Sequence, residues 1–186
     1  AALLKLTGEI AYQNQFAQEE RISATYNADN FDDQKWAIWT YTTIPASNTN
    51  VDPTLQNTLI ERCQQYADDN NLDGYNMRGW RQAGNEYFPI LIGQATTPMV
   101  MESVMAYHLS GEQKYLDAVI HTADYMLGGN PLNMTWVTGL GERYPRQLLN
   151  LDSWYDRKDP LVDGLIPYGP HRGDGNGYNG PWDVDF

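Results

Sequence analysis

The chain has 186 residues, of which 41% are apolar, enough for one domain with a hydrophobic core. It carries 12 Lys and Arg residues and 24 Asp and Glu residues, so its formal net charge is −12. This balance excludes a nucleic-acid partner, which needs a basic surface, and no apolar run has the length of a membrane span. A neutral or cationic ligand fits the charge, and so does an acidic surface that only contacts water.

Helical spacing of apolar residues dominates the first two thirds of the chain. The predicted helix at 53–70 has Asp52 as its N-cap and Pro53 at its first position. A further helix is expected to start after Gly8. The other predicted helices cover residues 1–6, 34–44, 97–109 and 112–127. The sequence thus predicts about six helices in all and no strand.

A weak internal repeat indicates how the helices connect. The stretch Leu6-Thr7-Gly8-Glu9 recurs 103 residues later as Leu109-Ser110-Gly111-Glu112. Glycine supplies the left-handed residue that ends a helix, and glutamate suits the positive end of the next helix. Each copy therefore predicts a hairpin of two antiparallel helices.

Residues 129–186 differ from the helical part, which covers 1–128. They are rich in Gly, Pro, Asn and Asp with interleaved aromatic residues, and they predict a long functional loop region. Cys63 is the single cysteine, so an internal disulfide is excluded. Its place in a helix favours a buried structural thiol over a nucleophile.

One segment resembles a known family. Residues 125–141 read Tyr-Met-Leu-Gly-Gly-Asn-Pro-Leu-Asn-Met-Thr-Trp-Val-Thr-Gly-Leu-Gly. This is similar to the glycoside hydrolases of family 9, in which a helix ends in Tyr-x-Leu-Gly-x-Asn-Pro-Leu and a Val-Thr-Gly-x-Gly stretch follows. Residues 87–98, 151–156 and 166–170 also look like a bacterial branch of this family. Residues 1–79 match it only in their helical hairpins.

The resemblance implies an all-α fold, the (α/α)6 toroid-type barrel, of which about half is expected here. Residues 1–186 are then a partial catalytic domain, with helical hairpins at 1–128 and cleft loops at 129–186. The apolar pattern is at full strength from Ala1, and no terminating signal follows Asp183, so we expect the chain to be the C-terminal half of a ring.

The family's activity is the hydrolysis of β-1,4-glucan bonds with inversion, by a carboxylic acid and a carboxylate base. Neither the family's early paired-Asp motif nor its late Glu is found in this chain. We therefore expect no catalytic residue here, and a role for the chain in holding the substrate. The family's paired His residues are also missing from 144–150, which leaves the specificity for cellulose open.

Polar and aromatic residues of the loop region are the candidates for substrate binding. Arg and Asn side chains can donate hydrogen bonds to sugar hydroxyls, and Trp and Tyr rings can stack on sugar rings. Ordinary loop packing is the alternative for each of them. The candidate residues are Trp136, Arg143, Arg146, Asn150, Asp152, Trp154, Tyr155, Tyr168, His171 and Arg172.

Metal binding is not required by the inferred reaction, and the metal content is left open. The Asp, Asn and Gly residues of 173–177 are compatible with calcium, although they do not match an EF-hand loop. Asp152, Asp156 and Asp159 lack a histidine partner, so solvated loop acids explain them. His108 and His121 lie on predicted helices without a metal-ligand spacing.

Two functions remain open from the sequence. The first is a secreted glycosidase of the endoglucanase or cellulase type, extracellular or periplasmic, whose partners are a polysaccharide and the remainder of its own barrel. The second is a non-catalytic carbohydrate-binding or structural protein built on half of the fold. An early paired Asp and a late Glu outside these residues would distinguish the first from the second.

Overall fold

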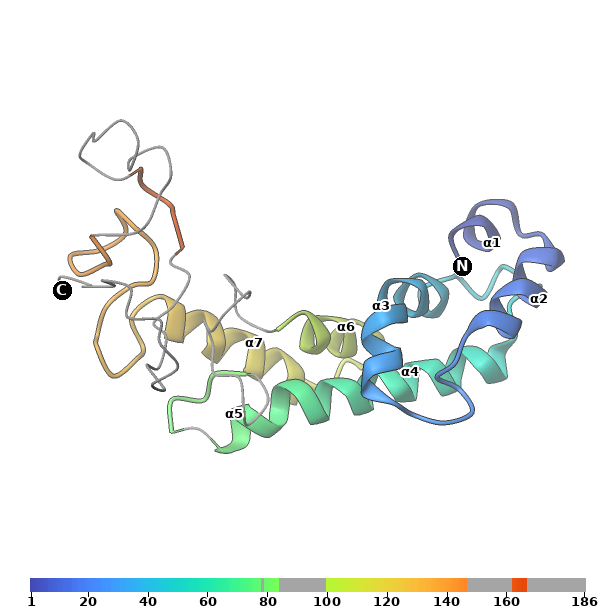
Figure 1. Ribbon diagram of the computed structural model, residues 1–186, viewed down its shortest axis with the longest axis horizontal. Helices are drawn as coiled ribbons and strands as arrows, with labels where there is room; N and C mark the ends of the chain where they lie inside the picture. The colour runs from blue at the N-terminus through green and yellow to red at the C-terminus, as the bar shows by residue number, and fades with distance from the viewer. Residues whose placement is uncertain (78, 84–99, 147–161, 167–186) are drawn as a thin grey trace, which may run out of the picture. The chain divides into compact units, whose positions relative to one another are not determined.

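The computed structural model describes residues 1–77, 79–83, 100–146 and 162–166, which form helices and loops without a β-strand (Figure 1). No helix in these ranges is long and apolar enough to cross a membrane. The chain divides into two units. The first holds Ala1–Asn71 and Met101–Leu116, and the second holds Leu72–Val100 and Asp117–Phe186.

The helices follow the predicted order. Predicted residues 97–99 lie outside the described ranges, and the helix there is described from Met101 onward. The last predicted helix, at 112–127, agrees with the structure to within one residue at each end. The helices are α1 (Ala2–Thr7), α2 (Ile10–Glu19), α3 (Ala28–Thr42), α4 (Pro53–Ala67), η1 (Asp68–Leu72), α5 (Asp73–Met77), α6 (Met101–Ser110) and α7 (Gln113–Met126).

Helix α3 begins earlier than the predicted range of 34–44. Its N-cap is Asn27, whose side chain accepts a hydrogen bond from Asn30 N at 2.9 Å. Phe31 is the only large apolar residue between Ala28 and Lys35, so apolar spacing gave too weak a signal for the true start. The cap satisfies a backbone donor that the helix itself leaves unpaired.

Helix α4 begins at Pro53 as predicted, because Asp52 Oδ1 accepts hydrogen bonds from the amides of Thr54 and Leu55 at 2.8 and 3.3 Å. Its α-helical part ends at Ala67. The π-helix η1 follows it, beginning inside the predicted range of 53–70 and ending beyond it at Leu72.

The side chain of Asn71 explains how the π-helix is held. Asn71 is fully buried, and its Oδ1 accepts hydrogen bonds from Ser103 N at 3.0 Å and from Ser103 Oγ at 2.8 Å. These bonds connect η1 to α6. A buried amide needs such partners, and this one finds them only by packing against another helix.

The internal repeat forms two hairpin turns with the same hydrogen bonds. Gly8 ends α1 with φ 72°, and Gly111 ends α6 with φ 71°. Each glycine amide donates to the carbonyl four residues earlier, at 2.9 and 2.8 Å. Each preceding hydroxyl, of Thr7 or Ser110, accepts from the amide two residues later, at 3.2 and 3.1 Å. The repeat therefore marks two helix-ending turns of the same construction, and the hairpins at 1–128 stay a prediction.

The core of the first unit contains two stacked pairs of aromatic rings. Phe16 stacks on Tyr41 with ring centroids 4.2 Å apart, and Phe31 stacks on Tyr66 at 4.3 Å. The buried Tyr41 hydroxyl donates to Gln13 Oε1 at 2.8 Å, which satisfies its polar tip. Two of the 13 Tyr residues, Tyr41 and Tyr66, therefore serve core packing and not ligand binding.

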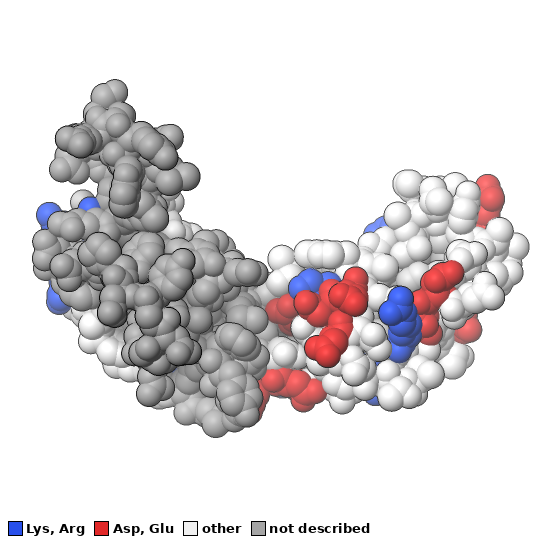
Figure 2. Space-filling view, in the orientation of Figure 1, with Lys and Arg blue, Asp and Glu red and all other residues white. Residues whose placement is uncertain are grey.

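The surface of the first unit mixes charges of both signs. Figure 2 shows acidic and basic side chains beside one another on the face drawn there. One example is the pair of Lys35 and Asp32, whose Nζ and Oδ1 atoms are 2.7 Å apart. The Lys35 side chain is half-buried and that of Asp32 is exposed, and ion pairs that solvent can reach contribute little to stability.

Cys63 lies in the core of the first unit, as predicted for a structural thiol. Its side chain is 2% exposed, and burial raises the pKa of its thiol to about 12. We expect iodoacetamide at about pH 8 to leave Cys63 unmodified in the folded chain and to label it fully in urea. Labelling of the native chain at the rate of the unfolded chain, followed by mass spectrometry, would contradict this placement.

The raised pKa of Cys63 also determines how the stability of the fold changes with pH. The ordinary thiol value is 9.0, so the unfolded chain releases this proton first as the pH rises above that value. Cys63 therefore contributes a loss of stability between about pH 9 and about pH 12, and none near neutrality.

Candidate functional site

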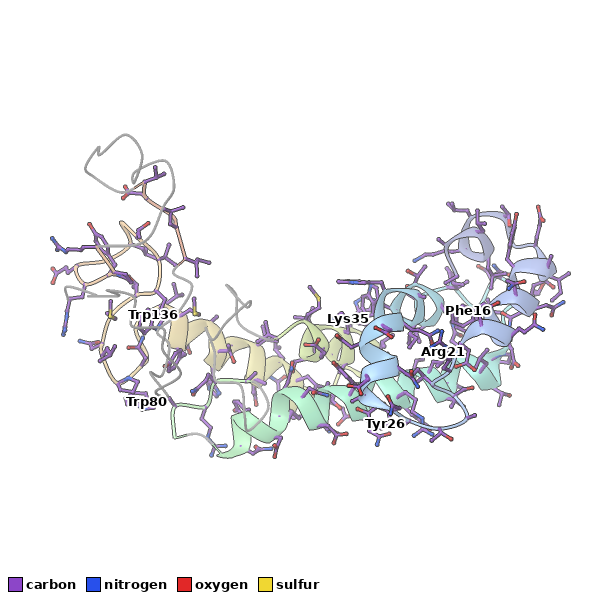
Figure 3. The ribbon with its side chains drawn as sticks, viewed as in Figure 1. Phe16, Arg21, Tyr26, Lys35, Trp80 and Trp136 are labelled. Atoms are coloured by element: carbon purple, nitrogen blue, oxygen red, sulfur yellow. The ribbon has the colours of Figure 1, made fainter. Side chains whose placement is uncertain are left out.

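The segment that carries the family resemblance forms the end of α7 and the loop after it, within the second unit. We call residues 127–146 the α7 loop; Trp136, labelled in Figure 3, belongs to it. The helix stops as predicted at two glycines. Gly128 has φ 124°, and Gly129 N donates to Asp124 O at 2.7 Å. A Cβ at Gly129 would lie 3.0 Å from Asp124 O, so a larger residue would crowd this turn.

Asn130 organises the start of the α7 loop. It is 3% exposed, and its Nδ2 donates to Tyr125 O and Met134 O, both at 2.7 Å. Its Oδ1 accepts from Leu132 N at 3.1 Å. One side chain thus satisfies a carbonyl at the helix end and fixes the turn that follows. The family motif identifies the end of the helix near these residues, but it does not predict these bonds.

Trp136 packs inside the loop. Its amide donates to Met126 O at 2.9 Å, and its side chain is 2% exposed in a cluster with Met126, Met134 and Tyr125. A ring buried to this extent presents no open face to a sugar. This placement corrects the expectation that Trp136 stacks on substrate, and it realises the packing alternative, because the loop folds back over the end of α7.

Thr135 fixes the part of the loop that carries the two candidate arginines. Its amide donates to Arg143 O at 2.9 Å, and its hydroxyl lies 3.2 Å from the same oxygen. The hydroxyl also contacts the carbonyl of Leu140. Both arginine side chains are exposed, and Arg146 Cζ lies 5.4 Å from the centroid of the Tyr144 ring. This ring contact restricts the orientation of the guanidinium group.

Thr138 joins the α7 loop to residues 162–166. Its amide donates to Leu165 O at 2.9 Å, and its carbonyl accepts from Gly164 N at 2.8 Å. Its hydroxyl donates to Val162 O at 2.7 Å and accepts from Leu165 N at 2.9 Å. Thr138 is 2% exposed, so these bonds are shielded from water.

Gly139 is the point of closest approach between these two segments. Its φ is 72°, and a Cβ there would lie 2.1 Å from Asp163 Oδ1 and 2.8 Å from Asp163 Cβ. Only a residue without a side chain leaves room for this close approach.

Seven candidates lie outside the described residues: Asn150, Asp152, Trp154, Tyr155, Tyr168, His171 and Arg172. Residues 173–177, whose composition is compatible with calcium binding, also lie outside the described residues. Their roles stay predictions. Of the candidates that are described, Arg143 and Arg146 remain available to a ligand, and the loop that carries them is tied down by backbone hydrogen bonds.

The histidines that the sequence left unassigned make aromatic contacts. His108 packs edge-on against Trp39, with ring centroids 5.2 Å apart. His121 stacks on Tyr75 at 5.8 Å, and its Nδ1 lies 2.8 Å from the Tyr75 hydroxyl. Within the described ranges, no group of three or more His, Cys, Asp or Glu side chains is arranged to hold a metal ion.

A second exposed cluster lies near the start of the second unit, where the sequence suggested no site. Arg81 has a positive φ of 56°, and its Cζ is 5.4 Å from the centroid of the Tyr75 ring. The neighbouring Trp80 is 49% exposed. A left-handed arginine over a tyrosine ring has no signal in helical periodicity, so the pattern of apolar residues could not reveal it.

Comparisons with known proteins identify the same family as the motif of the α7 loop. The family model described as glycosyl hydrolase family 9 matches residues 1–180. The chain is 28% identical over 142 residues to endoglucanase C of Cellulomonas fimi, a match that covers 76% of this chain and 12% of that protein.

Solved structures give the fold. A metagenome-derived glycoside hydrolase family 9 endoglucanase superimposes with a TM-score of 0.68 at 25% identity, covering 90% of this chain and 30% of that one. The family 9 endoglucanase J30 superimposes with a TM-score of 0.54 at 18% identity, covering 69% of this chain and 23% of that one. The chain thus spans less than a third of each relative, and its helices form part of an (α/α)6 barrel.

Proposed function

The chain belongs to glycosyl hydrolase family 9, and on this premise we propose that it forms part of a secreted enzyme that hydrolyses β-1,4-linked glucan or a related polysaccharide. The relatives named above are endoglucanases, which supports a glucan as the substrate. The chain's own contribution is the contact surface of the α7 loop. The partners of this chain are the polysaccharide and the remainder of its barrel.

The observation that carries the proposal is the construction of the α7 loop. The segment that matches the family is fixed by Asn130, Thr135 and Thr138, while Arg143 and Arg146 stay exposed. Guanidinium groups offer several donors in a fixed plane, and a sugar offers hydroxyl acceptors. A loop whose backbone is held before binding loses little conformational freedom when a ligand arrives.

The reaction that we propose is inversion at the anomeric carbon. One carboxylic acid protonates the leaving oxygen, and a carboxylate roughly 6.5–9.5 Å away activates water on the opposite face of the sugar. We assign neither group to this chain. Its part in the mechanism is to hold the glucan chain in register, so that the reacting bond stays between two groups supplied by the rest of the barrel. The chemistry needs no cofactor.

A hydrolysis assay on the source polypeptide that contains these residues tests the proposal. We expect it to release reducing ends from a soluble β-1,4-glucan, and proton NMR of the first products should show the α-anomer, as inversion requires. β-Anomeric first products would contradict inversion. Release of no reducing ends from β-glucans, together with retained binding, would favour the carbohydrate-binding function instead.

A further inference from the structure

Thr138 has an unusual share of the contacts within the loop region. It uses its amide, its carbonyl and its hydroxyl on one short segment, with four hydrogen bonds of 2.7 to 2.9 Å to Val162, Gly164 and Leu165. The residues it joins are 24 to 27 positions apart, so no local preference brings them together. The close approach of Gly139 to Asp163 lies directly beside these bonds.

We propose that Thr138 is a positioning residue for saccharide binding. Through its hydrogen bonds it sets the distance between the α7 loop, which carries Arg143 and Arg146, and residues 162–166. The candidate Tyr168 follows this segment in the sequence. Thr138 contacts no sugar itself, because it is 2% exposed. The inference rests on the proposed function, since it assigns the purpose of a loop that binds glucan.

The hydroxyl is the part of Thr138 that a variant can remove. It serves as donor to Val162 O and as acceptor for Leu165 N, so its loss leaves one carbonyl and one amide without their partner. Thr138→Val keeps the shape and the two backbone bonds. Thr138→Ser keeps the hydroxyl. The difference between these variants therefore isolates the hydroxyl from the volume of the side chain.

A matched control is available on α4. The hydroxyl of Thr58 donates to Thr54 O at 3.0 Å, within its own helix in the first unit. Thr58→Val makes the same chemical change far along the chain from the α7 loop. It reports any general effect of replacing a hydroxyl by a methyl group.

The test measures the affinity of the 186-residue chain for cellohexaose by calorimetry, well below the thermal midpoint of each variant. We expect Thr138→Val to weaken binding about tenfold, and Thr138→Ser and Thr58→Val to stay within about twofold of the original chain. Unchanged affinity in folded Thr138→Val, even with a lower thermal midpoint, would reduce Thr138 to a structural role and overturn the inference. So would a failure of Thr138→Ser to restore the affinity.

Hydrogen exchange keeps the inference testable if Thr138→Val does not fold. In the original chain the amides of Gly164 and Leu165 should exchange as slowly as those of the middle of α7. In Thr138→Ser they should stay within about threefold of that rate. Rapid exchange of these two amides in the original chain would show that the bonds do not persist, and would overturn the inference.

The two proposals fail in different ways. If the source polypeptide that contains these residues neither binds nor hydrolyses a β-1,4-glucan, the proposed function is contradicted, whatever the variants do. If the original chain binds and Thr138→Val binds equally well, the function stands and the assignment of Thr138 is wrong.

Discussion

Replacing Asn130 by alanine is expected to lower the free energy of unfolding by about 3 kcal/mol. The Asn130 side chain is 3% exposed and donates to Tyr125 O and Met134 O at 2.7 Å each. Alanine would leave both carbonyls without this donor and would remove the acceptor for Leu132 N. Urea denaturation followed by circular dichroism measures the change.

Asn130→Asp separates the hydrogen bonds from the packing. Aspartate has the same shape and keeps an acceptor for Leu132 N, but its charged oxygen would face the two carbonyls that Asn130 Nδ2 now contacts. We expect it to be at least as destabilising as alanine. Asn57→Ala, at an exposed position of α4, is the control and should stay within about 0.5 kcal/mol of the original chain. A mild effect of Asn130→Asp would mean that the amide does not hold the loop.

Gly139→Ala is expected to destabilise the chain by about 2–4 kcal/mol, for two additive reasons. Its φ of 72° is unfavourable for an L-residue with a side chain, and the added Cβ would overlap the side chain of Asp163. Denaturation in urea measures the sum. The same variant should weaken cellohexaose binding, because the α7 loop would be pushed away from residues 162–166.

Gly111→Ala is the matched control for this effect. Gly111 has φ 71°, and nothing lies within 4 Å of the position of its Cβ. Gly111→Ala therefore measures only the cost of placing a residue with a side chain at a positive φ, which is about 1 kcal/mol. If the two glycine variants lose the same stability and Gly139→Ala binds cellohexaose normally, the close approach of Asp163 is not a constraint on the loop.

The helices could be predicted where apolar spacing and caps agree. Helix α7 lies within one residue of its predicted range, and Asp52 caps α4 as expected. The early start of α3 was missed because Phe31 is the only large apolar residue in its first two turns and the start is fixed by the polar cap Asn27. The π-helix was missed because the bonds between Asn71 and Ser103 join residues that are 32 positions apart.

The candidate site was harder to predict because one residue type serves two purposes. Trp suits both a sugar ring and a core, and only the tertiary fold decides that Trp136 is packed against Met126 and Met134. The family motif located the loop correctly, since its glycines and Asn130 end the helix. Thr138 and its partners in 162–165 are 24 to 27 positions apart, and no sequence pattern signals their contact. The motif could therefore identify the segment but not the residues that it contacts.

A calorimetric titration of the 186-residue chain with cellohexaose, with analysis of the sugar afterwards, tests the central claim most directly. We expect saturable binding and intact cellohexaose, because the chain holds the glucan while the acid and the base belong to the rest of the barrel. Absence of binding would contradict the role of the α7 loop. Cleavage of the hexamer by this chain alone would contradict the assignment of both carboxyl groups outside it.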